Sequence, residues 1–196
     1  MRRPTFDWRD GSGRTGRAYA AGIAKLLDQG RRLTVQRTDR VKRPTAGERA
    51  ARVAASQLGV IETGTNTGRQ VQVYQASTTE TGTGWPWCMA FVRWVWDRAG
   101  IHPNGYRGAY VPHLVTWAKK AGKWSQRPVV GAAVVFDWDG GVADHVGIVE
   151  RVRPDAVSIF IEGNAQPGRG GDQSNGGGVW RRDDRTAPTI LGYVHP

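Results

Sequence analysis

The chain has 196 residues, of which 39% are hydrophobic and 23% are charged, a composition typical of a folded protein rather than a disordered one. At this length we expect one domain, or one domain with a tail. No apolar run approaches the ~18 residues of a membrane helix, and the first ten residues lack the apolar stretch of a signal peptide. The single cysteine, Cys88, excludes an intramolecular disulfide and a cysteine-rich zinc site.

The formal net charge of +11 is uneven along the chain, because residues 1–45 carry +8 and residues 46–196 carry +3. A basic segment is attracted to polyanions such as nucleic acids, anionic lipids or anionic wall polymers, although a solvated tail has the same composition. We therefore expect two parts. A basic N-terminal segment over 1–45 is partly disordered, or holds a short helix at Arg17–Asp28 and an extended stretch at Leu33–Val41. A packed domain covers 46–196.

Two amphipathic helices are predicted on either side of a more apolar one. The first follows a capping box, in which the Thr45 hydroxyl and the Glu48 carboxylate satisfy free N–H groups, and it ends at Gly59. Apolar residues recur at helical spacing between these signals. The later helix covers Pro112–Ala121. Its expected inward residues are Leu114, Trp117, Ala118 and Ala121.

The central helix is predicted to follow Gly82–Gly84. Pro86 suits its first turn, because the N–H that proline lacks would have no partner there, and Cys88 falls in the same turn. The run Trp87–Trp96 is apolar on almost every side, so we expect this helix to be buried. Gly100 is its predicted end.

The second half of the chain changes character and predicts an antiparallel sheet. Short runs of β-branched and aromatic residues alternate there with turn residues. Helices followed by strands indicate an α+β fold. The predicted strands are Val129–Phe136, Val146–Val152, Val157–Ile161, Gly178–Arg182 and Ile190–Val194.

One predicted hairpin brings polar residues together. A turn at Arg153–Ala156 suits its Pro-Asp pair, and it sets the register of the two strands. In that register His145 lies opposite Asn164, and Glu162 is its diagonal neighbour on the same face. A slip of one residue would separate these side chains.

Cys88 and this hairpin together form a pattern for nucleophilic catalysis. A thiol in the first turn of a helix lies at the positive end of the helix dipole, which favours the thiolate. A neighbouring imidazole can activate the thiol, and a carboxylate or carboxamide on the other ring nitrogen orients that imidazole. A lone cysteine is otherwise a small buried apolar side chain. The helix start and the hairpin pairing favour the catalytic interpretation.

Several linked motifs resemble CHAP domains, the cysteine, histidine-dependent amidohydrolase/peptidases. The resemblance covers about residues 46–196, with the motifs in the family's order. The segment Gly84–Val95 resembles the family's nucleophile motif, and Asp144–Glu150 resembles its histidine strand. Ile161–Asn164 resembles the strand that supplies the third catalytic group. The family's closing strands are resembled by Gly177–Arg182 and Leu191–Val194. One departure is Ala132, which stands where an aspartate is usual in the family.

The resemblance implies a papain-like α+β fold, with N-terminal helices packed on a twisted antiparallel sheet. It implies a peptidoglycan hydrolase that cleaves an amide bond with Cys88 as nucleophile and His145 as general base. Glu162 would orient His145, and Asn164 would assist by positioning or polarising. Both an N-acetylmuramoyl-L-alanine amidase and an endopeptidase of the stem or cross-bridge fit these motifs.

We expect neither a cofactor nor a metal. Some relatives bind calcium through an acidic cluster just before the cysteine, but here that stretch offers only Glu80. The segment Asp137–Gly140 resembles a fragment of a calcium loop, without the remaining ligands or the closing glutamate.

Aromatic residues near the expected cleft are candidates for substrate binding. Tyr74 is a candidate side-chain donor to the oxyanion, beside the Cys88 backbone N–H, although a core tyrosine fits the same pattern. Trp87 has the spacing of a core residue in the central helix. The candidates for binding substrate are Tyr74, Trp85, Trp87, Trp138 and Trp180.

The expected partner is bacterial peptidoglycan, with anionic wall polymers as candidate partners of the basic N-terminal segment, and the protein is expected to be a monomer. A phage endolysin or virion-associated lysin fits, made in the cytoplasm without a signal peptide and reaching the wall after holin-type release, lysis or virion delivery. Two alternatives stay open. One is a cysteine amidohydrolase acting on a small amide. The other is a nucleic-acid-binding protein that uses the basic arm, which we do not favour because no nucleic-acid motif is present.

Overall fold

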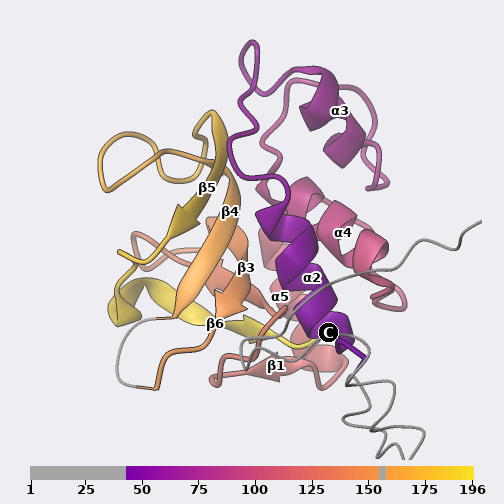
Figure 1. Cartoon of the computed structure of the whole chain (residues 1–196), viewed down its shortest axis with the longest axis vertical. Helices are drawn as coiled ribbons and strands as arrows, with labels where there is room; N and C mark the ends of the chain where they lie inside the picture. Colours follow the sequence, from indigo (N-terminus) through magenta and orange to yellow (C-terminus); the bar gives the residue numbers. More distant parts are fainter. Residues whose placement is uncertain (1–42, 155–157) are drawn as a thin grey trace, which may run out of the picture. The chain divides into compact units, whose positions relative to one another are not determined.

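The computed structural model describes residues 43–154 and 158–196, and Pro44–Pro196 form one compact unit (Figure 1). The helix expected at Arg17–Asp28 and the extended stretch at Leu33–Val41 lie outside the described residues. The helices are α2 (Ala46–Ala55), α3 (Arg69–Gln75), α4 (Cys88–Ala99) and α5 (Val111–Lys120), with a 3₁₀ turn, η1 (Ala187–Thr189). The strands are β1 (Trp124–Ser125), β2 (Ala133–Phe136), β3 (His145–Arg151), β4 (Ile159–Ala165), β5 (Gly178–Arg182) and β6 (Ile190–Val194).

Within the described residues the strands form one antiparallel sheet in the order β1-β6-β2-β3-β4-β5. Helices α2 and α4 pack against β3 and β4, as Figure 1 shows, and the chain is therefore α+β as predicted. None of the helices in this part of the chain is long and apolar enough to cross a membrane.

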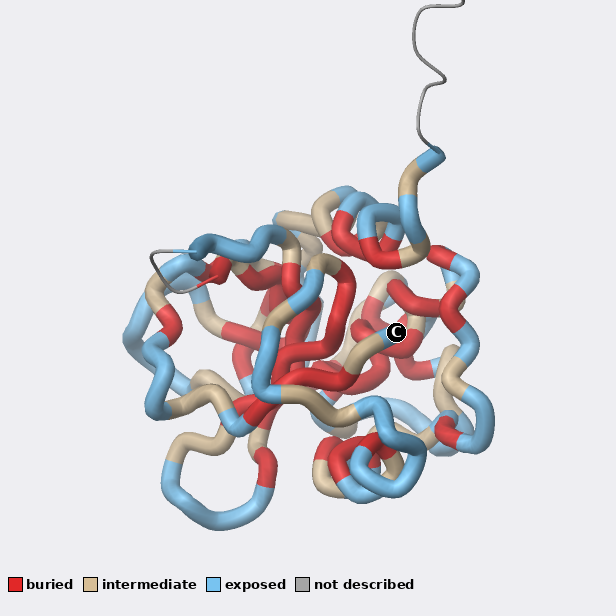
Figure 2. Tube along the Cα trace, turned by 90° about the horizontal axis from the view of Figure 1, so that it is seen from below, coloured by how far each residue is buried: buried red, intermediate tan, exposed pale blue. Residues whose placement is uncertain are grey.

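The main core lies between the helices and one face of the sheet, and Figure 2 shows these buried segments enclosed by exposed loops. A smaller apolar cluster covers the other face. Because side chains alternate along β2, Ala133 and Val135 join the main core, whereas Val134 and Phe136 join the smaller cluster. Ala132 is fully buried in that smaller cluster, where the apolar neighbours suit an alanine.

The predicted helix signals are confirmed with small shifts. Thr45 and Glu48 form the expected capping box on α2, which ends at Ala55 rather than near Gly59. Helix α4 begins at Cys88 and ends at Gly100, whose φ of 76° is the left-handed conformation that glycine adopts easily. Pro86 was expected in the first turn of α4, but it lies outside the helix, because Trp87 is the N-cap with non-helical angles.

Other elements differ from the sequence-based expectation. Helix α3 was not predicted, since seven residues are too few to display a clear period. Helix α5 buries Val111 and Val115, whereas Trp117 is half-buried and Ala121 is exposed. Strand β2 begins at Ala133 rather than Val129, because Gly131 adopts a φ of 82° in a tight turn before it.

Candidate active site

Near the candidate site, β3 and β4 pair in the register that was predicted from the hairpin turn. Ile148 pairs with Ile161 and Val149 with Phe160. Nearer the turn the pairing shifts by one residue, and a bulge between Val149 and Arg151 compensates for that shift. The turn residues 155–157 lie outside the described residues. The bulge thus preserves the alignment that places His145 diagonal to Glu162.

His145 and Glu162 are in direct contact at the centre of the sheet. The Nε2 atom of His145 lies 3.3 Å from Oε2 of Glu162, and both side chains are completely buried. The geometry is that of an ion pair rather than of an aligned hydrogen bond. In the absence of substrate, the distances of catalytic contacts of this kind are often longer than those of normal hydrogen bonds. The contact fixes which ring nitrogen faces the carboxylate and leaves the other available to Cys88.

Cys88 is the first residue of α4 and is 4% exposed. Its N–H belongs to the first turn, where backbone N–H groups have no partner within the helix. The thiol is close enough to His145 to contribute to the raised pKa of the imidazole. Cys88 at the start of α4, His145 at the start of β3 and Glu162 on β4 thus form one connected row of side chains.

Two opposing effects set the protonation of His145. Burial alone would lower the pKa of the imidazole, because the charged form loses its hydration. The contacts with Cys88 and Glu162 outweigh burial and raise the pKa of His145 from 6.5 to about 9. The imidazolium form therefore dominates at neutral pH.

Glu162 is ionised for a similar reason. Burial would raise the pKa of this carboxyl group, but contacts with Arg185 and His145 hold it below its usual value. A carboxylate with two cationic neighbours can orient His145 over a wide pH range. Sequence analysis missed Arg185, which lies in the charged run 181–185 between β5 and η1.

Asn164 is buried near this row, but its side chain turns toward the loop before β5. Its backbone has a φ of 59°, and the pairing of β4 with β5 is irregular between Glu162 and Ala165. The Asn164 amide donates to the carbonyl of Ser174 and to Oδ1 of Asn175, at 3.3 and 3.2 Å. Asn164 therefore contacts this loop, and its expected assistance to His145 stays a prediction.

The candidate aromatic residues separate by burial. Trp87 is fully buried, with its indole stacked on Tyr74 at 5.6 Å, so it packs in the core beside Cys88. Trp85, Trp138 and Trp180 are only partly buried and keep some surface that a substrate could contact.

Tyr74 has the packing of a core residue. It is fully buried in α3, with its ring against Phe91 and Trp94 as well as Trp87. Its hydroxyl donates to Oε1 of Gln57 at 2.8 Å. That bond directs the hydroxyl at Gln57, and the role as oxyanion donor stays a prediction.

Two polar side chains that sequence analysis did not single out hold the segment before Cys88. Nε2 of the buried Gln75 donates to the Trp85 carbonyl at 2.9 Å. Nε1 of Trp87 donates to Oε2 of Glu62 at 3.0 Å. Together these bonds anchor the two residues that lead into the helix start, and so they position the thiol.

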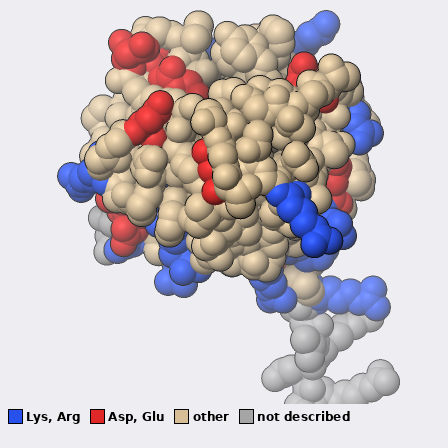
Figure 3. Space-filling view, turned by 90° about the horizontal axis from the view of Figure 1, so that it is seen from above, with Lys and Arg blue, Asp and Glu red and all other residues tan. Residues whose placement is uncertain are grey.

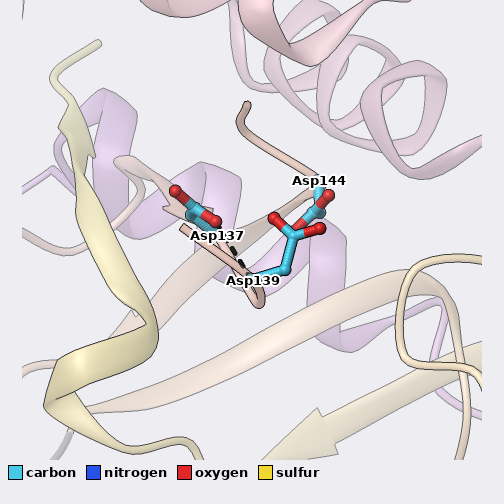
Figure 4. A group of neighbouring side chains, drawn as sticks. All are labelled: Asp137, Asp139 and Asp144. Atoms are coloured by element: carbon cyan, nitrogen blue, oxygen red, sulfur yellow. Dashed lines mark hydrogen bonds between the residues drawn. The ribbon is translucent and has the colours of Figure 1, made fainter. Parts of the chain in front are cut away.

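An acidic group lies just before β3. The carboxylates of Asp137, Asp139 and Asp144 come within 4.8 Å of one another (Figure 4). Each of them accepts hydrogen bonds from backbone N–H groups of the same loop, including those of Trp138 and Gly140. This bonding explains the cluster as a stabilised turn, and the expectation that no metal binds stays untested.

Gly147 provides the space that Glu162 occupies. A Cβ atom at Gly147 would lie 2.6 Å from Cγ of Glu162 and 3.0 Å from the Ile161 carbonyl oxygen. Gly147→Ala should push the carboxylate away from His145 and lower kcat by roughly 10- to 100-fold, since small displacements of catalytic groups have effects of that size. Gly170→Ala is the matched control, because a methyl group added there would have nothing within 4 Å. Wild-type kcat in a folded Gly147→Ala protein would contradict this prediction.

The surface charge of the described residues is mixed. On the face shown in Figure 3, Lys and Arg side chains lie mainly around the margin, with Asp and Glu side chains among them and a broad uncharged area between. Binding to a nucleic-acid backbone requires a continuous basic patch. The face in Figure 3 does not offer one.

The α+β fold thus brings a cysteine, a histidine and a carboxylate together in one site. Residues 80–164 match the family model described as CHAP domain, and this match supports a CHAP domain in that segment. This family implies a hydrolase of the peptidoglycan amidase or peptidase type. Neither a curated protein nor a solved structure matches the chain.

Proposed function

We propose that the protein is a cysteine peptidoglycan hydrolase that cleaves an amide bond of the bacterial cell wall. The observation that carries the proposal is the row formed by Cys88, His145 and Glu162, with the thiol at the start of α4. The match of residues 80–164 to the CHAP domain supports the same reaction class.

The geometry is suited to acyl transfer. The Cys88 thiolate attacks the amide carbonyl and forms a C–S bond, and the Cys88 backbone N–H lies at the helix start, where it can donate to the oxyanion. His145 then protonates the leaving amine as the C–N bond breaks. In the second half, His145 takes a proton from water and the hydroxide attacks the thioester, and the C–S bond breaks to release the carboxylic acid and restore the Cys88 thiolate beside the protonated His145. Glu162 keeps His145 oriented through both halves.

A lysin role follows from this activity together with the sequence. We propose a phage endolysin or virion-associated lysin that reaches the wall after holin-type release, cell lysis or virion delivery. The basic segment over 1–45 would add attraction to anionic wall polymers.

Digestion of purified peptidoglycan tests the proposal. We expect wild-type protein to lower the turbidity of a wall suspension and Cys88→Ala to leave it unchanged, with both proteins shown to be folded by circular dichroism. Mass spectrometry of the soluble products identifies the bond: free L-alanine amino termini indicate an amidase, and new ends within the stem or cross-bridge indicate an endopeptidase. Equal clearing by both proteins would overturn the role of Cys88. No clearing of several wall types by folded wild type would favour the small-amide alternative.

A further inference from the structure

Glu162 has a second cationic partner that the catalytic row does not explain. Arg185 lies between β5 and η1, beyond the segment that matches the CHAP domain, and is 6% exposed. Its Nε donates to Oε1 of Glu162 at 2.9 Å, and its Nη2 makes a short contact with Oε2. Both carboxylate oxygens are therefore held by one guanidinium group, a two-point contact that fixes the plane of the carboxylate.

The guanidinium group is itself held from several sides. It lies over the rings of Trp138 and Phe136, at 4.8 and 5.4 Å from their centres. Its Nη1 donates to Oε1 of Gln173 at 2.8 Å. Rotation of Arg185 would break these contacts, so the orientation of Glu162 is set by a rigid support rather than by an isolated side chain.

The charges alternate along the row. In its active form the row runs from the Cys88 thiolate through the His145 imidazolium and the Glu162 carboxylate to the Arg185 guanidinium. Arginine remains protonated throughout the pH range in which proteins are folded. Without it, a fully buried carboxylate would depend on His145 alone for compensation, and protonation of Glu162 would become the cheaper state.

We propose that Arg185 is a positioning residue of the active site, which acts through Glu162 by keeping that carboxylate charged and aimed at Nε2 of His145. As an effect on catalysis, this role rests on the proposed function. The contact geometry, however, also makes a prediction about the Cys88 thiol that needs no substrate.

The other charged groups near this row supply a matched control. Glu162 faces His145 from β3 and Arg185 from the segment after β5, and Cys88 reaches it only through His145. Arg182 is as deeply buried as Arg185 and donates to the same Gln173 oxygen, but it pairs with Asp184 instead of Glu162. Arg182→Gln therefore removes a buried arginine from the same region while leaving the contacts of Arg185 with Glu162 and Gln173 in place.

The experiment compares Arg185→Gln, Arg185→Lys and Arg182→Gln with wild type. Removing a positive charge makes the remaining groups hold protons more tightly, so in Arg185→Gln the acidic limb of kcat/KM should move up by about one pH unit or more. The rate of iodoacetamide alkylation of Cys88 should move with it. Arg185→Lys keeps the charge but not the two-point contact, so we expect the limb to return toward its wild-type position while kcat falls about tenfold at unchanged KM. Arg182→Gln should leave the limb in place.

The outcomes are separable. The positioning role is overturned if the acidic limb of the kcat/KM pH profile does not shift in folded Arg185→Gln. It is also overturned if Arg182→Gln shifts that limb as much as Arg185→Gln does. If Arg185→Gln does not fold, wild-type kcat in folded Arg185→Lys overturns it instead. If no peptidoglycan is hydrolysed by wild type, the proposed function fails on its own, and the alkylation profiles still decide the role of Arg185.

Discussion

Replacing His145 with glutamine should lower kcat by about 10²- to 10⁴-fold, the range that a positioned general acid–base contributes. The variant loses both the imidazolium beside Cys88 and the proton donor to the leaving amine. Because Glu162 keeps its contact with Arg185, the carboxylate remains paired and the fold should persist. Turbidity assays with purified peptidoglycan, after a thermal unfolding control, measure the effect.

His113→Gln is the matched control, because His113 is exposed on α5. We expect that variant to retain wild-type kcat. If His145→Gln retained more than about a tenth of wild-type kcat, His145 would not be the acid–base group.

The basic limb of the wild-type pH profile follows from the same residue. The pKa of His145 is raised to about 9, so the protonated form that supports the thiolate persists through neutral pH and is lost as the pH rises through that value. We expect kcat/KM to fall above about pH 9. Because the folded-state pKa exceeds that of an unfolded histidine, this group stabilises the fold fully below about pH 6.5 and no longer does so above about 9. A profile that already falls near pH 6.5 would contradict the contacts assigned to His145.

Glu162→Gln should have the second large effect, on both activity and stability. The amide keeps the shape of the side chain but removes the negative charge between two cations. It leaves the buried Arg185 without a carboxylate, and breaking a buried ion pair from one side costs about 3–5 kcal/mol. We expect kcat to fall by about 10²-fold or more, as in triads whose carboxylate is replaced by an amide. Urea unfolding and peptidoglycan hydrolysis measure the two effects separately.

The stability effect of Glu162→Gln should depend on pH in a defined direction. Although burial opposes ionisation, Arg185 and His145 hold the pKa of Glu162 below its ordinary value of 4.5. A lowered carboxyl pKa gives stability that is present above the unfolded value and is lost as the pH falls through the folded one. The difference between wild type and Glu162→Gln should therefore shrink as the pH falls below about 4.5. A difference that stayed the same down to the acid unfolding of both proteins would show that Glu162 is not held as a charged group.

Sequence analysis predicted some helix ends and the side-chain alternation along strands, because neighbouring residues determine these features. The capping box at Thr45 and the glycine at position 100 act within one turn of their helix, so their structural consequences follow from neighbouring residues. The diagonal placement of His145 and Glu162 followed from strand alternation once a register was assumed. These predictions required no knowledge of the remainder of the chain.

The parts that sequence analysis missed depend on distant residues. Arg185 reaches Glu162 across a loop and lies in a charged run, which from sequence alone resembles an exposed turn. Asn164 was expected to assist His145, and its positive φ and the irregular pairing of β4 with β5 accompany amide contacts with the loop before β5 that the sequence did not predict. Alternation on a regular strand does not foresee a local break of that kind.

The compensating bulge near the hairpin turn illustrates the same limit. A register counted outward from the predicted turn is correct at Ile148, although the pairing of Arg151 is shifted by one residue. The one shift in this pairing lies between Val149 and Arg151, before the strand reaches His145. The main core favours the final alignment, because a slip of one residue would move Val146 and Ile148 out of it.

The pH dependence of iodoacetamide alkylation at Cys88 tests most directly whether His145 activates the thiol. Because Cys88 is the single cysteine of the chain, the intact mass of the protein reports its alkylation alone. We expect wild type to react well below pH 8 and His145→Gln to lose that reactivity. Alkylation of both proteins that falls about tenfold for each pH unit below about 8.5, as for an ordinary thiol, would contradict a thiolate–imidazolium pair and the hydrolase built on it.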